Sequence, residues 1–101
     1  MVLVKKIYEL TKEMPKSERY NLTDQLRRAA VSIPSNIAEG CSRDSSKEFS
    51  KYIQIALGSA FEVETQLLIV KDIDFAEIED SLFENLNRLQ KRLNALNKAI
   101  K

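Results

Sequence analysis

The sequence contains no histidine and a single cysteine, Cys41. Histidine is the commonest general base and metal ligand, so its absence removes most routes to acid–base or metal chemistry. One cysteine excludes an internal disulfide, and without an imidazole to activate it we interpret Cys41 as an unreactive loop thiol. The chain also has no glycine-rich phosphate loop and no Glu-x-x-His pairs of the kind that hold di-iron sites. We therefore expect no catalytic residues, no metal site and no cofactor.

Glycine and proline are also scarce, with two of each among 101 residues. A β-sandwich of this length needs a turn about every ten residues, usually marked by these residue types. Their scarcity indicates a few long elements. The length and the 44% hydrophobic content fit one domain over residues 1–101 with a single core.

Long uninterrupted apolar runs are missing as well. No stretch approaches the roughly 20 consecutive apolar residues of a membrane span, and the apolar start of the chain is too short for a signal peptide. We expect a cytoplasmic protein that makes no membrane contact.

The net charge of +1 gives no overall attraction to nucleic acid or membrane, but charge is distributed unevenly near the C-terminus. Residues 72–87 include six acidic and no basic side chains, whereas residues 88–101 include five basic and no acidic ones. Within one helix this order complements the helix macrodipole, at about 0.3–1 kcal/mol for each well-placed charge. The basic end has a second interpretation, as a binding surface.

Apolar residues recur at spacings of three and four in four successive stretches joined by short connections. This periodicity predicts an all-α fold, an up-down antiparallel four-helix bundle. The predicted helices run from about Val2 to Met14, from about Leu22 to Glu39, from Ser45 onward, and from Asp74 onward.

Local sequence signals mark several helix ends. Pro15 is expected to end the first helix, and Gly40 to close the second as its C-terminal cap. Ser45 is followed three residues later by Glu48, the spacing of a capping box, which predicts Ser45 as the N-cap of the third helix.

The third helix carries more apolar side chain than one intramolecular face needs. Its main seam consists of Phe49, Ile53, Ala56, Ala60, Val63, Leu67 and Val70. Further apolar residues lie outside that seam: Tyr52, Ile55, Leu57, Phe61, Leu68 and Ile69. This surplus predicts a second buried face, either inside the bundle or between subunits.

Pro34 and Gly58 both break a local rule, because they stand inside predicted helices. At Pro34 the second helix either kinks or breaks and restarts. We favour a kink, since the apolar periodicity continues beyond it; the bend is either purely structural or shapes a surface. Gly58 lies in a patch of small residues, which predicts close approach of another helix.

Pairing the second and third helices around Gly40 brings Arg27 and Arg28 close to Glu62. We expect a structural ion pair between one of these arginines and Glu62. The alternative is that the charges are simply solvated.

The stretch 20–40 contains the run Leu-Arg-Arg-Ala-Ala-Val-Ser-Ile-Pro-Ser-Asn-Ile-Ala-Glu-Gly, and further motifs follow at 43–49, 55–59 and 62–67. Together these segments resemble the four-helix-bundle proteins named after the intervening sequences of 23S ribosomal RNA. The resemblance is close over residues 5–70. It implies a bundle that assembles into a ring of five. It also implies a distant relation to accessory proteins of diversity-generating retroelements, similar pentamers that bind nucleic acid and a reverse transcriptase.

This chain departs from the family pattern in two places. It lacks the stretch with a tryptophan that usually precedes the first helix, and it has no glycine in the turn 72–75 before the fourth.

Two functions compete. The first is a non-enzymatic oligomeric scaffold that binds nucleic acid, with structured RNA favoured, weakly and through phosphates. Its candidate contacts are Arg43, Lys47, Lys51, Arg27 and Arg28, together with the basic end of the fourth helix. The near-neutral charge and the lack of a recognised aromatic stacking signal predict modest affinity. The alternative is a protein–protein adaptor that presents its helices to a partner enzyme and binds no nucleic acid.

Overall fold

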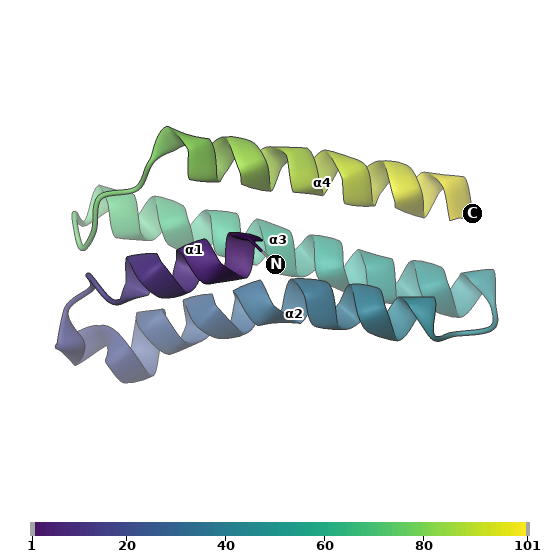
Figure 1. Cartoon of the computed structure of the whole chain (residues 1–101), viewed down its shortest axis with the longest axis horizontal. Coiled ribbons are helices and arrows are strands. Elements are labelled where there is room, and N and C mark those ends of the chain that lie inside the picture. Colours follow the sequence, from purple (N-terminus) through teal and green to yellow (C-terminus); the bar gives the residue numbers. More distant parts are fainter. Residues whose placement is uncertain (1, 101) are drawn as a thin grey trace.

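The structure is a computed structural model that describes residues 2–100, apart from the side chain of Arg19. Within this range the chain forms four α-helices and no strand. Consecutive helices run antiparallel and lie side by side, as Figure 1 shows. The predicted all-α, up-down antiparallel four-helix bundle is therefore confirmed. The helices are α1 (Val2–Thr11), α2 (Asp24–Cys41), α3 (Ser46–Asp72) and α4 (Asp80–Ile100).

The core is built around α3, which packs on both α2 and α4. Leu26 and Ile33 of α2 and Leu86 of α4 belong to this core and are fully buried. Burying one such aliphatic side chain stabilises a fold by roughly 1.5–3 kcal/mol relative to leaving it exposed. Six of the seven positions of the predicted α3 seam have no exposed surface: Ile53, Ala56, Ala60, Val63, Leu67 and Val70. The seventh, Phe49 in the first turn, is half-buried.

Both ends of α3 are set by local sequence. Ser45 has extended dihedral angles, and its hydroxyl oxygen accepts a hydrogen bond from the backbone N–H of Glu48 at 3.1 Å, so the predicted N-cap is confirmed. Just beyond the other end, Asp74 adopts a φ of 56°, the left-handed conformation that Asp tolerates better than most residues. The expected start of the fourth helix at Asp74 is therefore wrong, because this residue forms the turn after α3. Helix α4 begins at Asp80.

The connection between α1 and α2 is longer than expected. Helix α1 ends at Thr11 rather than near Met14, and a 3-10 turn (Lys16–Glu18) and a π-helical turn (Arg19–Thr23) lead into α2. Met14 is still buried and contributes to the packing beneath this connection. Because α1 is short, it covers only part of the length of the bundle (Figure 1).

Gly40 does not close α2, so the predicted C-terminal cap is wrong. The helix continues to Cys41, and none of the described glycines has a positive φ. Gly40 is instead buried against α3. A Cβ atom at this position would lie 2.9 Å from Cδ1 of Phe49 and 3.1 Å from Cβ of Tyr52. The missing side chain lets the two helices approach each other closely.

Helix α2 runs through Pro34 without interruption, so the chain does not break and restart there. Figure 1 shows α2 as a bowed helix, as expected where a proline lacks an N–H and crowds the preceding turn. The side-chain amide of Asn36 donates to the Ser32 carbonyl at 2.7 Å and to the Ser32 hydroxyl at 2.9 Å. That hydroxyl lies 2.8 Å from the hydroxyl of Ser59 on α3. Polar contacts thus join the bowed part of α2 to its neighbour.

By length and hydropathy α3 would be able to cross a membrane. Its apolar seam nevertheless packs in the core of the bundle, between α2 and α4. The same composition is typical of the central helix of a soluble bundle, and this compact helical fold indicates a soluble protein.

Candidate nucleic-acid interface

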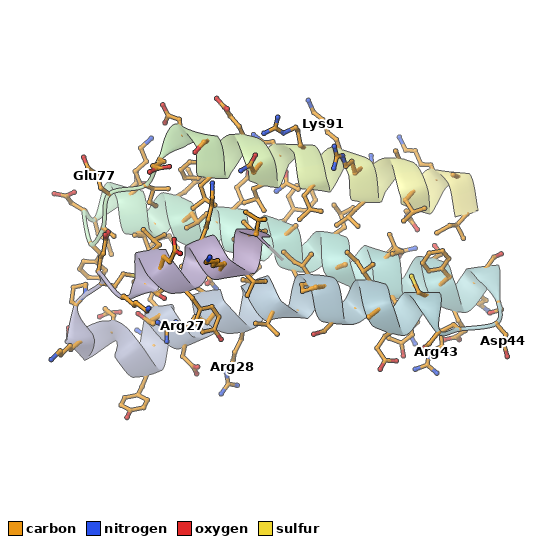
Figure 2. All side chains as sticks on the ribbon, viewed as in Figure 1. Arg27, Arg28, Arg43, Asp44, Glu77 and Lys91 are labelled. Carbon is orange, nitrogen blue, oxygen red and sulfur yellow. The ribbon has the colours of Figure 1, made fainter. Side chains whose placement is uncertain are left out.

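The five basic residues expected to contact nucleic acid do not form one patch within a subunit. Arg27 and Arg28 lie in the first half of α2 beside α1, whereas Arg43 lies beyond the other end of that helix, in the connection to α3 (Figure 2). Lys47 and Lys51 lie in the first turns of α3. The surroundings of each side chain decide which of them remain available to an anion.

Arg43 is engaged within the protein. Its guanidinium donates to the Glu39 carboxylate at 2.7 Å and to the Tyr52 hydroxyl at 3.1 Å, and it stacks 5.0 Å from the centroid of the Tyr52 ring. The hydrogen bond to Glu39 and, after it, the charge interaction with Tyr52 raise the pKa of Arg43 above its ordinary value. The side chain is cationic at every physiological pH, but a carboxylate already neutralises it.

Lys47 and Lys51 are exposed and share one face of α3, as their spacing of four predicts. They line an open groove together with Gln54 and, from α4, Ile100. Glu48 is the acidic residue on the rim of that groove. In the described part of the chain neither lysine takes part in an ion pair. Both ammonium groups are therefore available to phosphates.

Arg28 pairs with Asp24 one turn earlier in α2, with 3.1 Å between Nε and the carboxylate. The Arg28 side chain is 79% exposed, so water and salt screen this pair strongly. Such surface pairs contribute about 0–1 kcal/mol to stability. An anionic ligand can compete for the outer nitrogens of the guanidinium.

Arg27 is held by uncharged groups. Its Nε donates to the Thr11 hydroxyl at 2.7 Å, and its guanidinium carbon lies 4.6 Å from the centroid of the Tyr8 ring. Thr11 in turn donates to the backbone carbonyl of Tyr8 at 3.1 Å. Among residues 2–100 no carboxylate forms a salt bridge with Arg27. Arg27 is thus fixed in position and retains its full charge.

The expected ion pair of Arg27 or Arg28 with Glu62 is wrong. Glu62 accepts a hydrogen bond from Gln66 on its own helix at 3.2 Å, while the two arginines contact α1 and Asp24. The reason is the direction of the two arginine side chains. The contact of Ser32 with Ser59 places this part of α2 level with Glu62 along the bundle, but Arg27 points to Thr11 and Tyr8 of α1 and Arg28 folds back onto Asp24.

Tyr8 is the contact residue that the sequence reasoning missed. Its ring is stacked by Arg27, and the residue keeps 39% of its surface exposed. Lys5 and Lys12 lie three residues before and four residues after Tyr8, and both are exposed. That spacing places all three on one side of α1 and its continuation, and it could have been read from the sequence. An aromatic ring among basic residues is typical of single-strand binding surfaces.

The outward side of α3 carries large apolar side chains that nothing covers within the subunit, with the exposed Glu62 and Thr65 between them. Four of its large side chains are 42–50% exposed: Ile55, Phe61, Leu68 and Ile69. Gly58 is exposed as well, and a Cβ atom built on it would meet nothing within 4 Å. The expected close approach of another helix at Gly58 is therefore wrong within this chain. Its small neighbours Ala56, Ser59 and Ala60 face the core instead.

Acidic residues gather at the end of the bundle where α1 ends and α4 begins. A shallow hollow there is lined by Glu9, Glu13, Glu77 and Glu79. Figure 2 places Glu77 at this end, Arg43 toward the opposite one, and Lys91 on the outward side of α4. In the described residues no group of three or more acidic or cysteine side chains is arranged to hold a metal ion.

Comparison with known proteins bears on identity. The model of the 23S rRNA-intervening sequence protein family matches residues 1–95, which is nearly the whole chain. No curated protein sequence matches it. The four-helix bundle agrees with the fold that the resemblance implied. This chain therefore belongs to the 23S rRNA-intervening sequence protein family.

Proposed function

We propose that the protein is a non-enzymatic, oligomeric helical scaffold in the cytoplasm that binds nucleic acid, RNA foremost, weakly through phosphates. One observation carries this proposal. Of the five candidate basic side chains, Arg27, Lys47 and Lys51 take part in no salt bridge within the described residues. Cations that the fold leaves without a carboxylate partner are the groups that phosphates attract.

The outward face of α3, defined by Ile55, Gly58, Phe61, Leu68 and Ile69, supports the oligomer. Several large apolar side chains exposed along one helix are typical of a surface that another chain covers. The bare backbone at Gly58 would let a helix of another subunit approach closely. The family resemblance implies five subunits.

Oligomerisation matters for binding because it repeats each basic site. One subunit offers few phosphate contacts, whereas a ring offers the same contacts several times to one nucleic-acid chain. Multivalent engagement of this kind raises overall avidity by about a hundredfold or more without any new contact.

A protein–protein adaptor is the second candidate. The observation that favours it is the same apolar face of α3, because an amphipathic helix of a partner enzyme could lie on that face as readily as another subunit. The two functions differ in whether polynucleotides bind at all.

The test is binding of labelled RNA and DNA by the purified oligomer at about 50 and 200 mM salt. We expect affinity to fall steeply with salt, with a slope of log affinity against log salt of about −0.7 per contacted phosphate in single strands and −0.9 in duplex DNA. The double charge reversal Lys47→Glu with Lys51→Glu should weaken binding to all sequences and flatten this slope. Its matched control is Lys16→Glu with Lys71→Glu, which changes the net charge equally but near the acidic end of the bundle.

If the wild-type oligomer retains neither RNA nor DNA at about 50 mM salt, the nucleic-acid function is wrong and the adaptor function replaces it. Equal weakening by both double variants would mean that only net charge matters and that Lys47 and Lys51 form no site.

A further inference from the structure

Resting on the proposed function, we infer that the α1–α2 face is a stacking site for an unpaired nucleotide of single-stranded nucleic acid. The site consists of Tyr8 and Arg27 as a platform, Arg28 and Lys5 as phosphate contacts, and Val31 as an apolar wall. It differs in kind from the groove of Lys47 and Lys51, where the described lining residues include no aromatic one.

The platform is already assembled in the free protein. The Thr11 hydroxyl accepts from Arg27 and donates to the Tyr8 carbonyl, so one side chain ties the guanidinium to the backbone turn that carries the ring. The guanidinium lies 4.6 Å from the ring centroid, within the range of a cation–π contact. Two planar groups held in this way need no reordering when a base stacks on them, which lowers the entropic cost of binding.

The charges around the platform favour an anion. Arg27 has no carboxylate partner among the described residues, and Lys5 and Lys12 are exposed on the same side of α1 as Tyr8. Among the described residues Asp24 is the one acid that lines the hollow, and its carboxylate is already paired with Nε of Arg28. Glu9, the residue after Tyr8, is exposed and lines a different hollow of α1. The excess of positive charge at this face therefore remains after that pair is counted.

The shape of the face fits a nucleotide. A hollow between α1 and α2 is lined by Tyr8, Asp24, Arg27, Arg28, Val31 and Ser32. Val31 is 39% exposed, as is Tyr8, so the hollow offers apolar surface to a base beside cations for its phosphate. The Ser32 hydroxyl contacts Asn36 and Ser59, which leaves recognition to the platform and the cations.

An unpaired nucleotide is favoured over a duplex for a geometric reason. Within a duplex the faces of the bases are covered by their neighbours, so a side chain that stacks on a base requires an unstacked one. Cations alone would bind duplex and single strand alike through phosphates. A ring and a guanidinium among those cations add a contribution that only single strands can use.

The experiment compares a single-stranded oligouridylate and an oligothymidylate of about 12 nucleotides with a duplex of the same length, by fluorescence anisotropy at low salt. We expect the wild-type protein to prefer both single strands over the duplex. Tyr8→Leu should weaken single-strand binding by about fivefold or more while leaving duplex binding unchanged, whereas Tyr8→Phe should retain affinity. Arg28→Gln, at an exposed position, should weaken binding while the helical content stays unchanged.

Intrinsic fluorescence supplies a second readout, because the chain has no tryptophan and three tyrosines. A base stacked on Tyr8 should quench part of the tyrosine emission, and Tyr8→Phe should abolish that part without loss of affinity. Tyr52→Phe is the matched control, since that ring is stacked by Arg43 at a different place.

The outcomes separate the inference from the function on which it rests. Binding that Tyr8→Leu and Arg28→Gln leave unchanged, but that reversal of Lys47 and Lys51 abolishes, overturns the stacking site and leaves the proposed function intact. Equal affinity of the wild-type protein for duplex and single strand also overturns the stacking site. If the wild-type protein binds no polynucleotide, both the stacking site and the proposed nucleic-acid function are wrong.

Discussion

At the scale of single residues, the two glycines of the chain have opposite surroundings. Gly40 is buried where α2 touches α3, and a methyl group there would overlap the ring of Phe49. Gly58 lies in the middle of α3, exposed, with open space around the position of a side chain. The sequence pattern predicts a helix cap at Gly40 and a close helix contact at Gly58, whereas the structure has the close contact at Gly40. The reason is that a glycine near the end of a helical pattern often caps the helix, and one in its middle often allows another helix to approach.

We predict that Gly40→Ala lowers the free energy of unfolding by about 1 kcal/mol, because overpacking costs about 1–3 kcal/mol and better helix propensity returns up to about 1. Gly58→Ala should raise it by up to about 1 kcal/mol, since only the propensity gain applies. Urea denaturation measures both. Each should be made in a Leu68→Lys background, so that subunit contacts at the α3 face do not contribute. Equal effects of the two substitutions would contradict the packing described for Gly40.

At the scale of elements, α2 departs most from a regular helix. It follows a π-helical turn, contains Pro34, and is joined to α3 through the hydroxyls of Ser32 and Ser59. Arg27 and Arg28 lie before Pro34 in α2, and Arg43 follows the other end of that helix (Figure 2). In an assembly of several subunits the bend of α2 would help to set how neighbours meet.

We predict that Pro34→Ala preserves the helical content but straightens α2 and alters the oligomer. Removing the proline restores a backbone N–H to the helix and removes the clash with the preceding turn, which together cost about 3 kcal/mol in a helix interior. Far-UV circular dichroism should be unchanged, and sedimentation should show a different size distribution. A variant that keeps the wild-type oligomer and merely gains stability would mean that the bend has no shaping role.

At the scale of the whole molecule, the bundle leaves an apolar face exposed along its longest helix. A monomer would present Ile55, Phe61, Leu68 and Ile69 to water, although the same helix already supplies most of the core. We therefore expect the protein to self-associate at micromolar concentrations, with five subunits as the family resemblance implies.

We predict that Leu68→Lys weakens subunit association by about tenfold or more, since burying an unpaired ammonium group costs more than about 1.4 kcal/mol. Its helicity should not change, because Leu68 is 47% exposed within the subunit. The control is Val2→Lys on α1, an exposed apolar residue away from α3. Sedimentation velocity gives the oligomeric state of each variant. If the wild-type protein sediments as a monomer, the proposed self-association into a ring is wrong.

Much of the fold followed from the sequence, because helical periodicity and capping are local. The heptad of α3 fixed which side of that helix is buried, and Ser45 with Glu48 fixed its first turn. The start of α4 was misplaced because Asp74 can either cap a helix or take a left-handed turn conformation. Its φ of 56° shows that Asp74 adopts the left-handed turn conformation.

The sequence by itself determined the helical class and most of the buried seam of α3. Only the tertiary structure decided what surrounds each basic side chain. Arg43 is neutralised by Glu39, whereas Arg27 is not neutralised, because α1 places a hydroxyl and an aromatic ring beside it rather than a carboxylate. The physical reason is that helical periodicity fixes which residues share a face of one helix, whereas the partner of a side chain depends on which neighbouring helix lies beside that face.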